Sequence, residues 1–400
     1  MATQPGPLLG RCESGERCLR SQGGAGGEGG RPKASALTEL GRRRQWSSAQ
    51  VLLAKLRALG LEPGEVGFQN AMISACDRAG QWERAQRFLV AMREVPHGGE
   101  PDTITYCAVV SACGRGFCWD LALNRLLEMR EQSLEPNTIT CNAATSACER
   151  SGEQAWPCAV ALLASMQRVG PWPDRITQNA AISACGRGLH WGLATALLVE
   201  MRGHRQEPNV VSCNAAAAAL SGGQQWGRAL QLMVEMSEDG LEADLASHGS
   251  VLSALERGRR WDLALALWRE MLQGGPVPDM IAGSTVISAC GQGRQWEWAL
   301  SVLTELQLRR LVPDAAAYGA AISACRAGLQ WERALCLSED MQNCSLKLDV
   351  ITYNALISAC ERSVQADTAL RLLQEMRGCD LELDVVSYSA VISACEKGQQ

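Results

Sequence analysis

The 400-residue sequence contains no long hydrophobic run and has only four histidines, four tyrosines and three phenylalanines. No apolar stretch approaches the length of about 18 residues that a membrane-spanning helix needs, and Pro7-Leu8-Leu9 is too short for a signal-peptide core. Cys-x-x-Cys pairs, His-x-Glu triplets and Gly-x4-Gly-Lys-Ser/Thr loops are also missing. These absences argue against membrane-spanning and secreted proteins, zinc deaminases, zinc fingers and P-loop enzymes. We therefore expect no active site, no metal and no cofactor.

Charge and cysteine content further limit the classes of protein to which this chain can belong. The net charge is −5 and the isoelectric point is near 5.6, which argues against a phosphate-binding surface because such a surface is normally basic. The 18 cysteines are too few for a disulfide-stabilised scaffold. In the absence of a secretory signal, they are predicted to be reduced thiols in an intracellular compartment that serve mostly as small packing residues.

Tryptophan is the common aromatic residue, and it marks an internal repeat. Successive members of one series lie 36, 37 and 37 residues apart and then five times 35 residues apart: Trp46, Trp82, Trp119, Trp156, Trp191, Trp226, Trp261, Trp296 and Trp331. A Ser-Ala-Cys tripeptide ends six residues before most of them, and a methionine follows ten residues after most of them. Three markers in one register indicate a repeated unit of about 35 residues.

Each unit is predicted to contain two helices. The first helix begins after an Asp or Asn that often follows Pro, as in Pro101-Asp102, which is a capping signal. Glycine-containing turns such as Arg78-Ala79-Gly80 separate the helices. The face of the second helix is clearest in a series spaced i, i+3, i+4, i+7 and i+10: Trp261, Ala264, Leu265, Trp268 and Met271. The Ser-Ala-Cys surface is expected to allow close approach of paired helices, with Trp and Met between units.

A hairpin of two short helices cannot bury its apolar face alone, so neighbouring hairpins must stack. The predicted fold class is therefore all-α, a right-handed α-solenoid of two-helix hairpins. Residues 65–400 are predicted to form about ten repeats, the last one incomplete, and residues 35–64 a divergent first hairpin. Residues 1–34 are predicted to be disordered; their arginines fit a transit peptide, whereas their glutamates do not. The chain stops one residue before the next expected tryptophan, so we expect it to continue.

The period and the residues of the unit resemble the pentatricopeptide repeat family. The resemblance is clearest in residues 349–357 (Asp-Val-Ile-Thr-Tyr-Asn-Ala-Leu-Ile), followed by Ala369-Leu370, Leu372-Leu373 and Glu375-Met376. The nearest rival is the tetratricopeptide repeat, which also has two helices but a period of about 34 residues. The gaps of 35 residues and the Tyr-Asn step inside the first helix favour the pentatricopeptide repeat. That family implies binding of single-stranded RNA, one repeat per base, usually in organelles.

The resemblance also implies base-reading residues. In this family two side chains per repeat contact the base edge, one inside the first helix and one at the start of the next repeat. The matching pairs are Asn70 with Asp102, Cys107 with Asn137, Asn142 with Asp174, Asn179 with Asn209, Asn214 with Asp244, Gly249 with Asp279, Ser284 with Asp314, Gly319 with Asp349, and Asn354 with Asp384. By the family's recognition rules the implied target is U-x-U-C-U-x-G-x-U, where x marks the pairs that begin with Cys107, Gly249 and Gly319 and should discriminate weakly.

A row of cations is the second candidate RNA contact, because the matching family position looks placed to contact phosphate. These cations lie two residues after the cysteine position: Arg78, Arg115, Arg150, Arg187, Arg257, Arg362 and Lys397. The acidic residues one position before the methionine are expected on the outer wall, away from RNA: Glu128, Glu200, Glu235, Glu270 and Glu375.

Each candidate also has a simpler structural explanation. Asp and Asn at a helix start are good caps, worth about 1 kcal/mol each. The inner asparagines can form a repeated bond between hairpins instead of facing a ligand. Arginine at a helix end can complement the negative C-terminal dipole. All of these alternatives stay open at the level of sequence.

Three hypotheses about function follow. The first is sequence-selective binding of single-stranded RNA in organellar RNA processing, stability or editing, in a chloroplast or mitochondrion, with a recruited RNA-processing enzyme as a further partner. The second is a protein-protein interaction scaffold of tetratricopeptide type, which the acidic balance and the glycines at base-reading positions support. The third is the targeting half of an enzyme whose catalytic domain follows residue 400. None of the three hypotheses involves a membrane or a small-molecule substrate. If the protein is not targeted to an organelle, we expect it in the cytoplasm.

Overall fold

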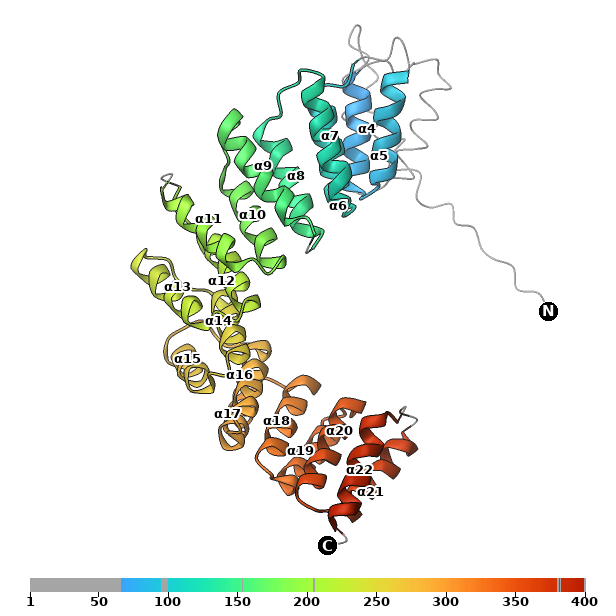
Figure 1. The fold of residues 1–400 in the computed structure, drawn as a ribbon, viewed down its shortest axis with the longest axis vertical. Coiled ribbons are helices and arrows are strands. Elements are labelled where there is room, and N and C mark those ends of the chain that lie inside the picture. Colours follow the sequence, from blue (N-terminus) through green and yellow to red (C-terminus); the bar gives the residue numbers. More distant parts are fainter. Residues whose placement is uncertain are drawn as a thin grey trace, which may run out of the picture. The chain divides into compact units, whose positions relative to one another are not determined.

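The computed structural model describes residues 66–94, 100–152, 154–203, 206–379, 381 and 383–398. Within them the chain forms nineteen helices and no strand (Figure 1). It divides into two compact units, Met1–Gly188 (the N-terminal unit) and Leu189–Gln400 (the C-terminal unit). The all-α solenoid expected from the repeat is confirmed. The predictions for residues 1–34 and 35–64 lie outside the described residues.

Each complete repeat contributes a first and a second helix. The first helices are α4 (Val66–Arg78), α6 (Thr103–Arg115), α8 (Thr138–Arg150), α10 (Arg175–Arg187), α12 (Val210–Gly222), α14 (Leu245–Arg257), α16 (Met280–Gln292), α18 (Ala315–Ala327), α20 (Val350–Arg362) and α22 (Val385–Gly398). The second helices are α5 (Trp82–Glu94), α7 (Trp119–Glu131), α9 (Trp156–Val169), α11 (Trp191–Gly203), α13 (Trp226–Glu238), α15 (Trp261–Gln273), α17 (Trp296–Leu308), α19 (Trp331–Asn343) and α21 (Ala366–Gly378). The tryptophan series therefore marks the first residue of eight of the nine second helices.

Side-chain caps start the first helices. Asp102 Oδ1 accepts the backbone N–H of Thr105 at 2.8 Å, and Asp349 Oδ1 accepts that of Thr352 at 2.8 Å. Equivalent caps are Asn137, Asp174, Asn209, Asp244, Asp279 and Asp314. Each bond satisfies an amide group that the first helical turn leaves without a partner. The capping explanation of these residues is thus confirmed.

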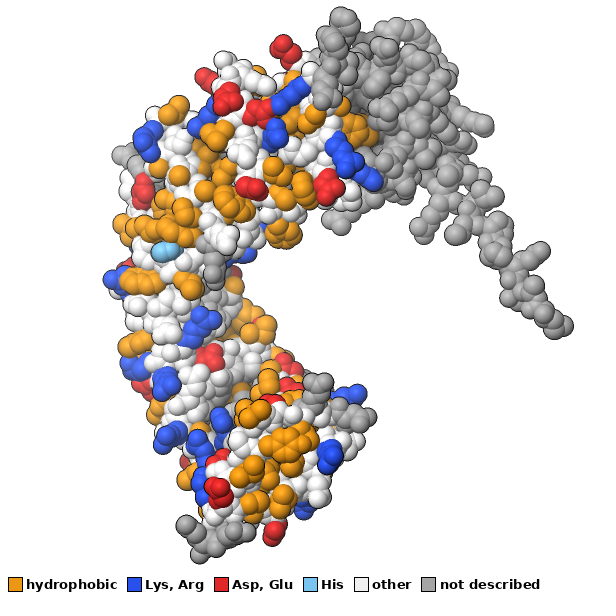
Figure 2. Space-filling view, turned by 45° about the vertical axis from the view of Figure 1, so that its right-hand side comes forward, with side chains coloured by type: hydrophobic (Ala, Val, Ile, Leu, Met, Phe, Trp, Pro, Cys, Tyr) orange, Lys and Arg blue, Asp and Glu red, His pale blue; other side chains and the backbone are white. Residues whose placement is uncertain are grey.

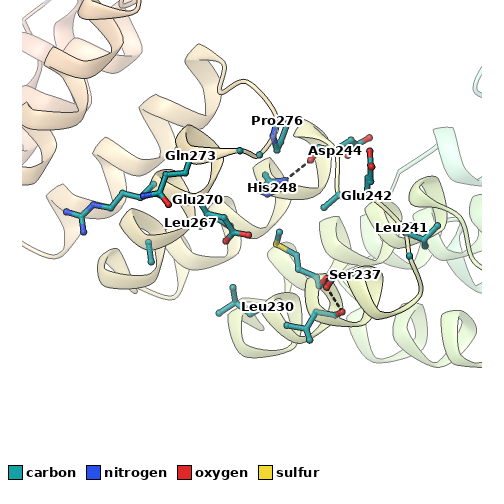
Figure 3. Close-up of a pocket in the computed structure, with 18 residues that line it drawn as sticks. Leu230, Ser237, Leu241, Glu242, Asp244, His248, Leu267, Glu270, Gln273 and Pro276 are labelled. Atoms are coloured by element: carbon teal, nitrogen blue, oxygen red, sulfur yellow. Dashed lines mark hydrogen bonds between the residues drawn. The ribbon is translucent and has the colours of Figure 1, made fainter.

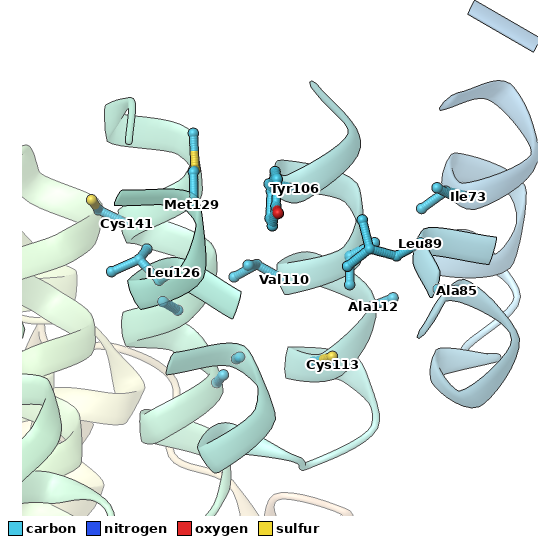
Figure 4. Packing of buried hydrophobic residues seen from close by; sticks show 14 of the residues in the cluster. Ile73, Ala85, Leu89, Tyr106, Val110, Ala112, Cys113, Leu126, Met129 and Cys141 are labelled. Atoms are coloured by element: carbon cyan, nitrogen blue, oxygen red, sulfur yellow. The ribbon is translucent and has the colours of Figure 1, made fainter. Parts of the chain in front are cut away.

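Small and sulfur-containing side chains fill the interior between a few large ones. In the N-terminal unit Tyr106, Val110 and Met129 are completely buried, and Leu89 and Cys113 lie beside them (Figure 4). Every cysteine among the described residues is a free thiol. Burial raises the pKa of thiols at the Ser-Ala-Cys position, to about 12 for Cys148 and Cys290. These cysteines therefore stay protonated and act as packing residues, as the sequence indicates.

In six of the nine described hairpins the turn uses glycine for a different reason than backbone freedom. Gly223 has an ordinary φ of −83°, and a Cβ atom there would lie 2.1 Å from Cδ1 of Trp191 in the preceding repeat. The left-handed conformation falls on the next residue, Gln224, with φ of 56°, and in a later repeat on Val364, with φ of 61°. The indole packs on the glycine Cα, which leaves no room for a side chain. Tryptophan thus fills the space between repeats, as predicted.

Stacking within each unit places the first helices in one continuous row. Each first helix packs against the first helix of the next repeat, as α16 does with α18 and α20 with α22 (Figure 1). Within a unit, a second helix packs between the first helices of its own repeat and the next, as α17 does with α16 and α18, whereas α11, which begins the C-terminal unit, packs against α12. Consecutive second helices make no comparably close contact within the described ranges. None of the helices described here has both the length and the hydropathy needed to cross a bilayer.

Some glutamates one position before the methionines are half-buried and form ion pairs. Glu128 pairs with Arg93 and Arg125, and Glu235 lies 2.8 Å from Nη1 of Arg202. These half-buried ion pairs link α5 to α7 and α11 to α13. Both glutamates lie on second helices, as expected, but the arginines neutralise their charge; the placement of this acidic row away from RNA stays a prediction. At the same repeat position, Glu270 and Glu375 are exposed.

Candidate nucleic-acid interface

Four of the predicted base-reading pairs are brought together by the stacking of first helices. Asn70 Nδ2 on α4 donates to both carboxylate oxygens of Asp102, at 3.0 and 3.2 Å. The same bond joins Asn142 to Asp174 at 2.8 Å, Asn214 to Asp244 at 3.0 Å, and Asn354 to Asp384 at 3.0 Å. Residues 30 to 32 positions apart in the chain thus meet at the start of a helix in every case.

A hydroxyl group three residues after the aspartate completes each of these pairs. Ser247 Oγ donates to Asn214 Oδ1 at 2.5 Å and lies 3.0 Å from Asp244 Oδ1. Thr105, Thr177 and Ser387 contact Asn70, Asn142 and Asn354 in the same way. Because a carboxylate can only accept, the asparagine must turn its NH2 group to the aspartate and its oxygen to the hydroxyl. Each amide is therefore held in one orientation.

This network is the bond between hairpins that the sequence analysis offered as the alternative to RNA contact. It nevertheless leaves some hydrogen-bonding groups of the asparagines available to a ligand. The asparagines do form a repeated bond between hairpins, as that alternative proposed. An Asn amide has two N–H groups and an oxygen with two lone pairs. Asn142 and Asn354 each donate one bond to the aspartate and accept one from the hydroxyl, and both are half-buried rather than enclosed, so a donor and an acceptor remain there at a fixed position for the edge of a nucleobase. Asn214 is also half-buried but donates to both carboxylate oxygens, and Asn70 is buried.

The remaining pairs behave differently. Ser284 donates to the Ile281 carbonyl of its own helix at 3.0 Å, while Asp314 caps α18 through Ala317 at 2.8 Å. Asn179 is half-buried on α10 and Asn209 caps α12, so this pair is divided between the two units. Cys107, Gly249 and Gly319 are half-buried and give no amide to the next repeat. The structure thus joins the Asn–Asp pairs within a unit but not the Ser–Asp pair.

The polar network lowers the pKa of Asp174, Asp244 and Asp384. Burial alone would raise the pKa of Asp244, but the Ser247 backbone N–H, the Asn214 amide and the Ser247 hydroxyl outweigh it and lower the pKa below the ordinary 3.8. The pKa of Asp174 is lowered by the equivalent groups against the same burial effect. At Asp384 the Ser387 hydroxyl is the main cause of the lowered pKa. These carboxylates are therefore ionised at neutral pH and act as acceptors.

A row of exposed aliphatic side chains was missed in the sequence analysis. Ile104 is 62% exposed, Ile351 is 76% exposed, and the row continues with Ile139, Ile176, Val211, Ile281 and Val386. Each lies two residues after a cap and three residues before a base-reading position, so both share one helix face. The sequence does contain a signal for this row, because an Ile or Val recurs at one position of the repeat that does not belong to the pattern of buried residues. Such a surface suits the faces of bases, which are flat and apolar.

The predicted phosphate contacts lie at the C-terminal ends of the first helices, but not all of them carry free charge. Arg115 Nη2 is 3.4 Å from Asp77 Oδ2, and Lys397 Nζ is 2.9 Å from Glu361 Oε1. Arg257 donates to the Ser221 carbonyl at 3.4 Å, as expected for a residue that complements a helix end. Arg150, Arg187 and Arg362 are exposed, whereas Arg78 is half-buried. On the face in Figure 2, acidic and basic side chains are interspersed.

A pocket lies between α13 and α15, and Asp244, a predicted base-reading residue, is among the residues that line it (Figure 3). His248 on its wall is buried, with Nδ1 2.9 Å from the Asp244 carbonyl. In four other repeats this position is Tyr, as at Tyr106, whose hydroxyl donates to Gln132 at 2.8 Å. Here the shorter His faces a position occupied by Gly274, which accounts for the open space. No group of three or more His, Cys, Asp or Glu side chains that could hold a metal occurs in the described part of the chain.

Several parts of the chain match models of known protein families. Family models match as "PPR repeat" at residues 104–134, 246–276 and 284–311, as "Pentatricopeptide repeat domain" at 125–188, and as "PPR repeat family" at 348–397. No significant match is found among curated protein sequences.

Two solved structures illustrate the similarity of fold. The crystal structure of the pentatricopeptide repeat protein PPR10 from maize has a TM-score of 0.55 and 22% sequence identity, with 92% of this chain and 62% of that chain covered. A structure of PPR10 in complex with an 18-nt psaJ RNA element has a TM-score of 0.48 and 21% identity, with 92% and 61% covered. The chain thus spans less than two thirds of the length of these chains, and the likeness shows the fold alone.

Proposed function

The chain is a pentatricopeptide repeat protein, and we propose that its row of first helices binds single-stranded RNA, with one base at each base-reading pair. The observation that carries this proposal is the recurrence of one polar arrangement, Asn–Asp–Ser/Thr, at the same position of four repeats, those that begin with α4, α8, α12 and α20. A donor and an acceptor that recur at equivalent positions along one row of helices suit a polymer of bases better than a single small ligand.

Three sets of side chains have separate roles in the proposed complex. The asparagine amides contact base edges while the aspartates hold them in place. The exposed aliphatic row, including Ile104 and Ile351, packs against base faces. Exposed cations such as Arg150 and Arg187 contact phosphates, so that affinity falls as salt concentration rises. The protein acts in an organelle, chloroplast or mitochondrion, in RNA processing, stability or editing, by occupying a transcript or recruiting a processing enzyme.

A competition assay tests whether recognition is sequence-selective. RNA containing U-x-U-C-U-x-G-x-U should compete better for the protein than an RNA of scrambled order and identical composition. Equal competition by both would remove the base-reading assignment and leave only binding through phosphates. Measurement at several salt concentrations is needed because affinities of nucleic-acid complexes depend strongly on ionic strength.

A reciprocal pair of substitutions gives a sharper test within the C-terminal unit. Asn214→Ser keeps Asp244 and should shift the preferred base at that repeat from uracil to guanine. Ser284→Asn keeps Asp314 and should shift the preference from guanine to uracil. Each variant is the matched control of the other, since the two changes are chemically opposite. Loss of affinity for all sequences, without a change of preference, would contradict a base-reading role.

A peptide-binding scaffold is the second candidate function, and the pocket between α13 and α15 favours it. Leu230, Leu241 and Leu267 provide an apolar lining, and Glu242 and Glu270 add negative charge. This combination suits a basic peptide. Retention of such peptides together with failure to retain RNA at low salt would favour the scaffold over the RNA-binding function.

A further inference from the structure

The penultimate residue of a first helix contacts the next repeat and is acidic in several repeats. Asp77 on α4 pairs with Arg115, and Glu361 on α20 accepts from Ser393 at 2.7 Å and from Lys397 at 2.9 Å. Glu256 on α14 accepts from Ser288 at 2.5 Å. Each of these acids thus bonds to a serine or a cation on the next first helix. Arg115 and Lys397, the cations that follow Asp77 and Glu361, are therefore neutralised within the protein.

Helix α18 reverses the sign of this position. Its penultimate residue is Arg326, and α20, which packs against α18, presents Ser358 and Arg362 at the positions of Ser393 and Lys397. Arg326 is half-buried, and its Nε is buried without a hydrogen-bond partner. No ion pair involving Arg326 occurs within the described residues, unlike Arg125 and Arg202, which share a buried Nε but pair through their terminal nitrogens. Arg326, Ser358 and Arg362 therefore occupy the positions at which the interface of α20 and α22 joins an acid to a serine and a cation.

We propose that Arg326 and Arg362 bind one phosphate group at the interface between α18 and α20. Like charges on adjacent helices repel, and an anion between them removes that repulsion. The planar guanidinium fork matches the oxygens of a phosphate, and the Ser358 hydroxyl supplies another donor. If the proposed RNA function holds, which this identification of the ligand rests on, the group is a backbone phosphate.

The placement of this site also explains how the repeat contributes to RNA binding. The same interface carries the Gly319–Asp349 pair at its other end, where glycine has no side chain to contact a base. Along α20, eight residues separate Asn354 from Arg362, which corresponds to a rise of about 12 Å. Weak base contact and strong phosphate contact thus coincide in one repeat. This repeat adds affinity without adding sequence preference.

Inorganic phosphate is the first probe, because it tests the site without RNA. The thermal unfolding midpoint is measured in sodium phosphate and in sodium chloride of equal ionic strength, for the wild type, Arg326→Glu and Glu361→Arg. Arg326→Glu restores the acid found in other repeats and should fold normally but lose the phosphate-specific stabilisation. Glu361→Arg places a second arginine beside Lys397 and should increase it. An identical response of wild type and Arg326→Glu to phosphate would overturn the proposal.

The salt dependence of RNA binding is the second readout. Each phosphate contact contributes about 0.7 to the slope of log affinity against log salt concentration for single strands. Arg326→Glu should reduce the magnitude of that slope by about 0.7 and leave the preferred sequence unchanged. An unchanged slope contradicts the site. If the wild type binds no RNA at all, the proposed function is wrong, and the phosphate titration still decides whether Arg326 and Arg362 bind the anion.

Discussion

Asn214 and Asp244 are thirty residues apart in the chain, and the Asn214 amide donates to both carboxylate oxygens, at 3.0 and 3.2 Å. The pair is therefore a tie between two repeats as well as a candidate reader of a base. A substitution at such a position changes the cohesion of the solenoid together with its ligand contacts. The effects on stability and on RNA binding must be measured separately.

Removal of the asparagine amide should weaken the tie between repeats. Asn214→Ala leaves Asp244 and Ser247 with fewer partners, and we expect the free energy of unfolding to fall by about 1 kcal/mol. Ser284→Ala is the matched control, because Ser284 donates only within its own helix, and it should change stability by less than about 0.5 kcal/mol. Urea unfolding followed by circular dichroism measures both. Equal stability of the two variants would show that the bond contributes nothing.

Acid should loosen the repeats through the same aspartates. The folded-state pKa values of Asp174, Asp244 and Asp384 are lowered, so they add stability above the ordinary aspartate pKa of 3.8. This stability is lost as pH falls below 3.8 through the folded-state values, because the unfolded chain binds protons first. Asp244→Asn keeps a capping residue but does not titrate. Its unfolding midpoint should depend less steeply on pH below 4 than that of the wild type, and a parallel dependence would contradict this assignment.

A methyl group added at a tryptophan contact should destabilise the fold. Gly223→Ala would place a Cβ 2.1 Å from Trp191 Cδ1, and such overpacking costs about 1–3 kcal/mol. Gly227→Ala is the control, because nothing lies within 4 Å of its Cβ position, and alanine in a helix is favoured over glycine by about 1 kcal/mol. Thermal unfolding should move the two variants in opposite directions. A stable Gly223→Ala protein would mean that the indole can move aside at little cost.

Thiol labelling should separate two classes of cysteine. Cys336, Cys344 and Cys379 are exposed, whereas burial raises the pKa of Cys148 and Cys290 to about 12. At pH 8 an alkylating reagent should modify the exposed thiols of the native protein and spare the buried ones, since the thiolate is the reactive form. Mass spectrometry of peptides locates the label. Rapid native labelling of Cys148 would show that the repeats open much more readily than their packing implies.

Sequence reasoning succeeded where a property depends on spacing along one helix. The tryptophan register predicts where second helices begin, and the Asp or Asn residues predict where first helices begin, because caps and amphipathic faces are local features. The residues of Ser-Ala-Cys lie where the pattern placed them, with Ala112 and Cys113 completely buried. The pairing of Asn with Asp came from the family resemblance, and the structure brings four such pairs together.

The turn glycines show why local reasoning is incomplete. A glycine between two helices suggests a left-handed backbone, yet Gly223 is an ordinary residue in φ and the left-handed position falls on Gln224. The reason lies in the preceding repeat, whose Trp191 occupies the space of a side chain. The exposed aliphatic row was missed for a different reason. Its signal is present in the sequence, but an apolar residue at a constant repeat position was not recognised as a surface feature.

The amino-acid sequence alone determined the period, the helix boundaries and the identity of the residues that recur at each position, because these follow from helical geometry and local capping. Only the tertiary structure decided which of those residues are already engaged. Asp77 neutralises Arg115, the hydroxyl of Ser247 orients Asn214, and Arg326 stands where an acid is found elsewhere. These relationships depend on the distance and direction between side chains of different repeats. The sequence of a single helix does not specify them, because they arise only when two helices pack together.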